Sequence, residues 1–321
     1  MRYPLINRFK GTLLGALLCE VLAKNTQEQS SICSDISEIA VLGTQSLIEL
    51  GKLDIDNWLE RHQTKFPHLN ITDAVDAVLP KAIIVTLPVT LFFHENTANL
   101  RQNLLHMLQL WEYDPIVRDG TLAVGYAIAQ CFTQKLHPQT LIPEIIAFIG
   151  ETTTLLPQKL LKLNDLLVQG VGLESAQAEF SREEEPSNAI AMAFYCFLST
   201  LEDLRLGVLR STHQDNIRRG ETGNLNSQTI TTITGALSGA YNSTAGIPVK
   251  WQVILCPTNL GNGELTNFFQ VLELADALVA VWSGVYDPAL HLKEYPEEGC
   301  AKYEEQTQLC VFASPRVIQS R

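Results

Sequence analysis

The stretch GNLNSQTITTITGALSGAY, residues 223–241, decides the fold class of this chain. Apolar and small residues recur in it at every third or fourth position, a period typical of an α-helix that buries one face. We expect its small residues Gly235, Ala236, Gly239 and Ala240 to permit close packing against another helix. Its polar opening has the form of a metal-binding loop that runs into a helix, but asparagine and glutamine stand where such a loop carries acids.

The same helical period extends over most of the sequence. One apolar stripe contains Leu13, Leu14, Leu17, Leu18 and Leu22, and another runs from Ile39 to Ile48. Further helical windows cover residues 73–94, 98–111, 116–135, 139–150, 155–168, 187–199, 201–212, 227–243 and 265–282. No alternation of strands with helices appears, which argues against a parallel-sheet enzyme. The sequence therefore predicts an all-α fold, a compact multi-helix bundle.

We expect one helical domain over residues 1–283 and an irregular C-terminal segment over residues 284–321, packed on that domain or on a partner subunit. Within this segment TQLCVFASPRV, residues 307–317, has enough β-branched and aromatic character for a short strand. Three loops are expected at residues 24–35, 170–188 and 212–227, the second of them acidic and flexible. Ser34 or Asp35 is the expected N-cap of the helix after the first loop.

Composition restricts the classes of function. The chain has 321 residues, of which 46% are apolar and 18% charged, as in a soluble globular protein. Its apolar runs fall short of the roughly 20 residues that a membrane helix needs. A net charge of −12 argues against nucleic acid and anionic membranes as partners. The seven cysteines are scattered without a CxxC pair, which favours a reducing compartment and argues against zinc, so we expect a cytoplasmic protein.

Four stretches combine into a family pattern. RFKGTLLGALLCEVLA at 8–23, SDIS at 34–37, YDP at 113–115 and NSQTITTITGALSGAYNSTAGIP at 226–248 occur in the order seen in ADP-ribosylglycohydrolases. The chain resembles that family from about residue 8 to about residue 282. The resemblance implies an all-α bundle whose cleft holds two magnesium ions and hydrolysis of the bond that links ADP-ribose to a protein side chain or a small molecule. Two divalent ions close together need several carboxylates to offset their charge.

The family supplies these carboxylates through Thr-Asp-Asp at one helix start and Asp-Thr-Asp-Thr at another. In this chain the matching positions read Ser34, Asp35 and Ile36, followed by Asn226, Ser227, Gln228 and Thr229. Of the four carboxylates only Asp35 survives. The N-terminal pattern also departs, with Cys19 where the family has glycine and Glu20 where it has aspartate, and Glu112 stands before the DP pair.

We therefore expect a divergent member of the family with a degraded magnesium site, a pseudoenzyme without a metal cofactor. Ser34, Asn226, Ser227, Gln228 and Thr229 are its expected ligand-binding residues. Its expected partner is an ADP-ribose-like small molecule or another protein, and a homo-oligomer is compatible with the sequence.

Two alternatives stay open. In the first, the protein is a hydrolase with a rebuilt single-metal site that binds magnesium, or with a metal-free site. Its candidate catalytic residues are Asp35, Glu20 and Glu112, with Asp35 as the residual metal ligand and Glu38 beside it on one helix face. In the second, the protein is an oligomeric scaffold.

Each candidate residue also has a structural interpretation. Asp35, Asn226, Ser227 and Thr229 suit helix capping, and Asp114 is expected to start a helix with Pro115 in its first turn. The third loop is most simply interpreted as a solvated loop. The weaker interpretations are that His213 and Asp215 act together as a general base and that Arg218 binds a phosphate.

Overall fold

The computed structural model describes residues 3–22, 30–65, 78–111, 114–180, 186–212, 223–254 and 268–285. At helix ends such as 19–22, 30–38 and 223–226 it describes the backbone alone. Helices and no strands occupy these ranges, which confirms the predicted all-α fold. The C-terminal segment beyond residue 285, with its expected strand at 307–317, lies outside the described residues.

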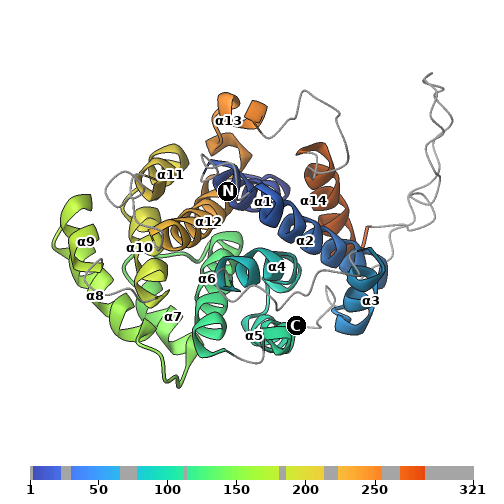
Figure 1. Cartoon of the computed structure of the whole chain (residues 1–321), viewed down its shortest axis with the longest axis horizontal. Helices are drawn as coiled ribbons and strands as arrows, with labels where there is room; N and C mark the ends of the chain where they lie inside the picture. Colours follow the sequence, from blue (N-terminus) through green and yellow to red (C-terminus); the bar gives the residue numbers. More distant parts are fainter. Residues whose placement is uncertain are drawn as a thin grey trace.

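The elements follow one another along the chain in a simple order. The α-helices are α1 Leu5–Leu22, α2 Ser30–Leu50, α3 Ile55–Lys65, α4 Val78–Phe93, α5 Thr97–Met107, α6 Pro115–Thr133, α7 Leu141–Ile149, α8 Leu156–Val168, α9 Leu173–Phe180, α10 Pro186–Leu198, α11 Leu204–Thr212, α12 Gly223–Asn242, α13 Val249–Ile254 and α14 Phe268–Ser283. Two 3₁₀ turns, η2 Leu108–Trp111 and η4 Thr244–Gly246, complete the set. In Figure 1, α7, α8 and α9 lie on one side of the bundle and α2, α3 and α14 on the other.

Helices α1 and α12 pack at the centre of the bundle through facing glycines. A Cβ atom added to Gly15 would lie 2.2 Å from the carbonyl oxygen of Gly235, and one added to Gly239 would lie 1.9 Å from that of Gly11. Only glycine permits backbones to approach this closely. The pairs 11 with 239 and 15 with 235 show that the two helices run antiparallel. The close packing expected of Gly235 and Gly239 is confirmed.

Helices α10 and α12 run parallel to each other. The hydroxyl of Thr234 donates to the carbonyl of Ala193 at 3.3 Å, and Nδ2 of Asn242 donates to the carbonyl of Leu201 at 2.9 Å. Both bonds join residues 41 positions apart. The same offset brings the first turn of α10, at residues 187–188, beside residues 228–229 of α12.

The core includes a buried histidine among aromatic rings. His94 stacks edge-on against Phe9 and Phe132, at ring-centroid distances of 5.5 and 5.3 Å, and lies 5.0 Å from the ring of Trp282. Its Nδ1 lies 2.7 Å from the carbonyl oxygen of Leu91 and donates to it. Burial lowers the pKa of His94 to about 4, so the ring is neutral at pH 7.

The expected helix starts at Ser34 and at Asn226 are wrong. Helix α2 begins at Ser30, and helix α12 begins at Gly223. Ser34 and Asp35 are the fifth and sixth residues of α2, and residues 226–229 are the fourth to seventh of α12, so none of them is an N-cap. The reason is that serine, aspartate and asparagine favour caps but are also tolerated inside a helix, so these residue types alone do not locate its first residue.

The expected acidic loop over 170–188 is also wrong in part. Residues 173–180 form α9, and α10 begins at Pro186. The acidic residues of α9 misled the prediction, because they lie on its outer face while Ala176 and Phe180 are buried. Glu179 forms an ion pair with Lys162 of α8 at 3.3 Å, which joins that outer face to its neighbour. The short helices α3 and α13 were not predicted either.

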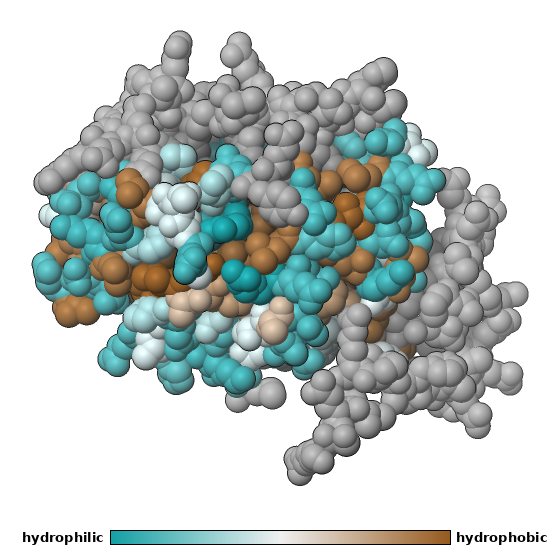
Figure 2. Space-filling model, turned by 90° about the horizontal axis from the view of Figure 1, so that it is seen from below, coloured by the Kyte–Doolittle hydropathy of each residue, from teal (hydrophilic) through white to brown (hydrophobic). Residues whose placement is uncertain are grey.

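The surface of the described residues carries both apolar and hydrophilic side chains. Figure 2 shows, on the face seen from below, a band of apolar residues flanked by hydrophilic ones. Exposed apolar side chains of the described part include Leu161, Val168 and Val249. No helix within the described ranges is long and apolar enough to cross a membrane.

Candidate functional site

The N-terminal end of α12 is the place where the sequence puts its candidate site. The antiparallel register of α1 and α12, with Gly15 beside Gly235, places the last turn of α1 beside residues 228–231 of α12. The backbone of Glu20 and the backbone of the segment 226–229 therefore lie at the same end of the bundle.

Helix α2 begins at the same end of the bundle, as its contacts with α14 show. Leu17 of α1, Val41 of α2 and Val271 of α14 line one small apolar cavity, which brings these three helices to a common level. Gly51, the residue after α2, lies near the side chain of Val281 of α14, so α2 and α14 run parallel. The first turns of α2, with Ser34 and Asp35, thus extend toward the last turn of α1.

The structure therefore brings together the backbones of the three predicted segments. It describes no side chains for Glu20, Ser34, Asp35 and Asn226. Glu112 and the third-loop residues His213, Asp215 and Arg218 lie outside the described residues altogether.

The three described side chains at the start of α12 are polar and uncharged. Ser227 and Thr229 are buried, with exposed fractions of 4% and 5%, and Gln228 is half-buried. The hydroxyl of Thr231 donates to the backbone carbonyl of Ser227 at 2.8 Å. Among the described residues, the hydroxyl oxygen of Ser227 has no hydrogen-bond partner. A buried hydroxyl left in this state costs about 1 to 3 kcal/mol.

Several helices point their N-terminal ends toward this region. A Cβ atom on Gly120 of α6 would lie 2.9 Å from the side chain of Leu79 in α4 and 2.9 Å from that of Ile190 in α10. The N-terminal halves of α4, α6 and α10 therefore meet, and the second turn of α12 lies beside the start of α10. Helix N-termini carry a positive partial charge and free N–H groups, so this end of the bundle favours an anionic group.

The donor set at the start of α12 does not fit a pair of magnesium ions. Two hydroxyls and one amide supply oxygen atoms but no negative charge, whereas two divalent cations need several carboxylates nearby. No group of three acidic, histidine or cysteine side chains within the described part of the chain has metal-site geometry. We derive no chemical step through magnesium.

One buried carboxylate, Asp119 on α6, was missed by the sequence reasoning. It is fully buried, and its Oδ1 accepts from the guanidinium of Arg118 at 2.7 Å. Its other oxygen accepts from the hydroxyls of Thr152 and Thr154, the latter at 2.5 Å. Asp119 therefore ties the loop before α8 to α6, and both its oxygens are engaged. An acid in the middle of an apolar helical window is the feature that marks it in the sequence.

Asp114 is the N-cap of α6, as expected. Its side chain accepts from the backbone N–H groups of Ile116 at 2.9 Å and Val117 at 3.5 Å, and Pro115 follows in the first turn. One oxygen of this carboxylate is therefore engaged in capping the helix. Cys131 and Cys196 are buried, and burial raises the pKa of each thiol to about 12, so neither is a nucleophile.

Comparison with known proteins agrees with this architecture. The sequence pattern described as ADP-ribosylglycohydrolase matches residues 1–288. A solved structure titled "ADP-ribosylglycohydrolase-related protein complex" shares the fold with a TM-score of 0.59 at 15% sequence identity, covering 87% of this chain and 99% of that one. No curated protein sequence matches the chain. Because the family pattern covers most of its length, the chain belongs to the ADP-ribosylglycohydrolase family.

Proposed function

We propose that this member of the family has lost the two-magnesium hydrolase activity and binds an ADP-ribose-like ligand at the N-terminal end of α12. The observation that carries the proposal is the buried hydroxyl of Ser227, which lacks a partner among the described residues. Buried polar atoms in folded proteins are nearly always hydrogen-bonded, and an exception needs a reason. A bound ligand that donates to this hydroxyl or accepts from it supplies one.

The surroundings favour a ligand with phosphate groups. The first turn of α10 lies beside the second turn of α12, and free N–H groups at helix N-termini bind phosphate oxygens well. Ser227, Gln228 and Thr229 add neutral donors and acceptors that suit ribose hydroxyls. The role is binding without turnover, because Ile36, Asn226 and Gln228 stand where the family carries three of its four carboxylates.

The direct test is titration calorimetry with ADP-ribose, with EDTA and then with magnesium, beside a hydrolysis assay on ADP-ribosylated protein and arginine. We expect binding that EDTA leaves unchanged and no release of ADP-ribose. Turnover that EDTA abolishes and magnesium restores is the signature of the rebuilt single-metal hydrolase and would overturn the proposal. Absence of binding at millimolar ADP-ribose would overturn it as well.

Ser227→Ala is a second test, in which the stability of the protein and its affinity for ADP-ribose should change in opposite directions. Removal of an unpartnered buried hydroxyl should raise the free energy of unfolding by roughly 1 kcal/mol. The same change should weaken ADP-ribose binding several-fold. Ser175→Ala, at an exposed position of α9, is the matched control and should change neither quantity. A Ser227→Ala variant that binds as tightly as the parent places the ligand elsewhere.

The inherited site can also be rebuilt. The triple variant Ile36→Asp, Asn226→Asp and Gln228→Asp restores the acids at the positions where the family carries them. We expect magnesium to raise the melting temperature of this variant and not that of the parent. Asn99→Asp with Gln102→Asp on exposed positions of α5 controls for added charge. A magnesium response in the parent would show that the metal site had survived.

A protein partner is the second candidate function. The structural neighbour is titled a protein complex, which favours a member of this fold that acts within an assembly. A partner-binding role for this chain predicts an oligomer whose mass, measured by light scattering, falls when the chain is cut after Val285. A monomer of unchanged mass before and after truncation removes the homo-oligomeric form of this proposal.

A further inference from the structure

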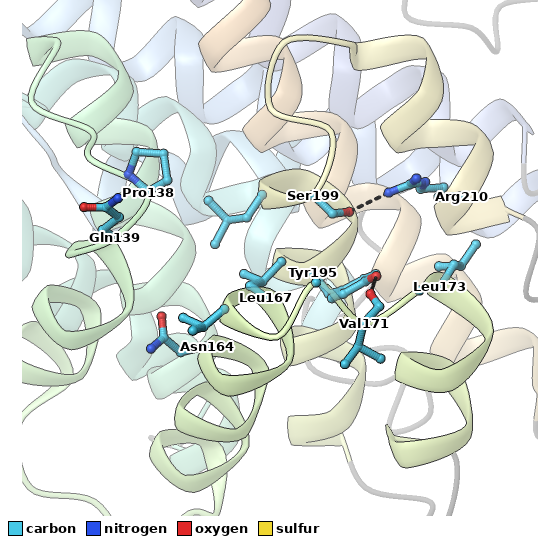
Figure 3. A pocket seen from close by; sticks show the side chains of 13 residues that line it. Pro138, Gln139, Asn164, Leu167, Val171, Leu173, Tyr195, Ser199 and Arg210 are labelled. Carbon is cyan, nitrogen blue, oxygen red and sulfur yellow. Dashed lines mark hydrogen bonds between the residues drawn. The ribbon is translucent and has the colours of Figure 1, made fainter.

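A groove of about 720 Å³ lies at the other end of α10, away from Ser227. Figure 3 shows Gln139 and Asn164 toward one end of this groove and Arg210 toward the other, with Leu167 and Tyr195 between them. Its volume is in the range of small-molecule sites, about 300 to 1,000 Å³. We name it the Arg210 groove. Its lining comes from the loop after α6, from α8, α10 and α11, and from residues 170–173.

Among the described residues, no carboxylate pairs with the cation in the Arg210 groove. The only hydrogen bond of the Arg210 guanidinium within the described part of the chain runs to the hydroxyl of Ser199, at 2.8 Å. No described acidic side chain forms an ion pair with it, although the whole chain carries a net charge of −12. Arg210 is half-buried. A half-buried guanidinium with most of its N–H groups free is suited to bidentate binding of a carboxylate or phosphate.

At the helix C-termini that line the groove, backbone carbonyls that could offset the charge of Arg210 already accept hydrogen bonds. At the end of α8, the N–H groups of Gly170 and Val171 bond back to the carbonyls of Leu167 and Leu166, at 3.1 and 3.0 Å. Gly170 has the positive φ of 65° that such a helix end requires. At the end of α10, the hydroxyl of Thr200 bonds to the carbonyl of Cys196 at 2.7 Å. With these carbonyls capped, the guanidinium is the dominant charge.

The rest of the lining fits an apolar or aromatic body. Leu167, Leu173 and Leu198 supply apolar contact area. The Tyr195 hydroxyl donates to the carbonyl of Val171 at 2.5 Å, which holds the ring in place beside the groove. Burial raises the pKa of Tyr195, and the charge of Arg210 opposes that rise, which reflects their proximity. The ring therefore remains a neutral contact surface at pH 7.

We propose that the Arg210 groove binds a small molecule with an apolar or aromatic body and one anionic group, carboxylate or phosphate, held by Arg210 and Ser199. The body of the ligand lies along Leu167, Leu198 and Tyr195. This site is separate from the one proposed at Ser227, since about 10 residues of α10, roughly 15 Å of helix, lie between them. Failure of either proposal leaves the other intact.

The experiment uses three probes of one shape on the full chain: 2-naphthoate, 2-naphthyl phosphate and the neutral 2-naphthamide. Binding is measured by saturation-transfer NMR and by calorimetry. We expect at least one anion to bind at least tenfold more tightly than the amide. The better anion then identifies a carboxylate or a phosphate as the natural group.

Two variants connect binding to the groove. Arg210→Gln should weaken the anion roughly tenfold to a hundredfold, the loss expected for a charge-assisted hydrogen bond, and leave the amide unchanged. Arg205→Gln, an exposed arginine on the same helix, is the matched control and should change nothing. Val168→Glu, at a position 80% exposed and therefore tolerant of substitution, should repel the anion.

Three results would each refute the proposal. They are absence of binding by both anions at millimolar concentration, equal affinity for anion and amide, and anion binding that Arg210→Gln leaves unchanged. Because Arg210 makes a single described hydrogen bond, its loss should leave the protein folded, which a melting curve checks.

Discussion

The two ends of α10 differ in the origin of their polarity. At the N-terminal end, beside Ser227, the positive charge comes from backbone N–H groups of neighbouring helices, and the described side chains of the α12 start are neutral. At the C-terminal end the backbone is capped, and one side chain, Arg210, supplies the charge. A change of ligand residues can erase a site built on side chains, whereas a site built on helix ends persists as long as the fold does.

This difference explains how a family member can lose its acids and remain folded. The start of α12 is positioned by the packing of α12 on α1 and α10, and that packing uses glycines and buried hydroxyls further along the helix. The residues at 226–229 take no part in the described glycine contacts. Substitutions at these positions can therefore leave the packing of α12 on α1 intact, because the residues that bind a ligand are distinct from those that hold the fold.

The largest expected effect is on the packing of α12 against α1, which supports the bundle at both ends of α10. Gly239→Leu should cost more than roughly 5 kcal/mol of the free energy of unfolding, because its side chain meets the backbone of α1 and cannot repack. Urea unfolding followed by circular dichroism measures the loss. Ala178→Leu, at an exposed position of α9, should cost little. A Gly239→Leu protein as stable as this control would mean that α1 and α12 do not pack as described.

The next largest effect should be confined to the end of the bundle that contains Ser227. Asp119→Ala leaves Arg118, Thr152 and Thr154 without their buried acceptor, and we expect a loss of roughly 3 to 5 kcal/mol. Naphthoate binding in the Arg210 groove should survive at temperatures where the variant is folded. The exposed acid Asp165 provides the control, since its replacement by alanine should cost less than about 0.5 kcal/mol. Equal costs for the two variants would show that Asp119 is not a structural anchor.

A pH effect should act on the core of the bundle, where His94 lies among the rings of Phe9, Phe132 and Trp282. Its pKa of about 4 in the folded state lies below the ordinary value of 6.5. Above pH 7 the ring is neutral in folded and unfolded chains and contributes nothing. As the pH falls from 6.5 toward 4 the unfolded chain binds a proton first, so we expect a loss of roughly 2 to 3 kcal/mol.

The pH effect is measured as the difference between variants. His94→Gln should remove that part of the acid destabilisation seen in urea unfolding between pH 7 and pH 4. His106→Gln, on the exposed face of α5, should leave the slope unchanged. If His94→Gln keeps the full slope of the parent, other groups cause the acid sensitivity.

The smallest effect concerns the start of α6. Asp114→Ala removes the two N-cap hydrogen bonds and should cost about 1 kcal/mol, while Asp114→Asn, which caps as well, should cost much less. Melting temperatures separate the two. An asparagine variant as unstable as the alanine variant would mean that the negative charge, and not the cap, is what matters at this end.

The sequence predicted the helical windows well because their apolar periods extend over many turns. Residues 116–135, for example, became α6 from Pro115 to Thr133. The start points of α2 and α12 were not predictable in the same way, since serine, aspartate and asparagine favour caps but are also tolerated inside a helix, as at Ser34, Asp35 and Ser227. The role of Gly235 and Gly239 was predicted, but their partners Gly11 and Gly15 were not, because partner choice is a tertiary property.

The two proposed sites also differ in whether the sequence could predict them. The start of α12 was found because its polar residues are consecutive and resemble a known pattern. The Arg210 groove was missed because its lining is drawn from segments between residues 138 and 210, and no local motif joins them. Arg210 itself lay in the predicted helical window 201–212, and nothing in the sequence indicates that it lacks a carboxylate partner among the described residues.

The contact of Gly11 and Gly15 with α12 also has a consequence for biosynthesis. During translation α1 leaves the ribosome first, and its glycine partners follow about 220 residues later. At 5 to 20 residues per second this interval is roughly 10 to 40 seconds. Throughout that time the leucine face of the first helix has no native partner in α12. The central pair of helices in the bundle can therefore form only after most of the chain has been synthesised.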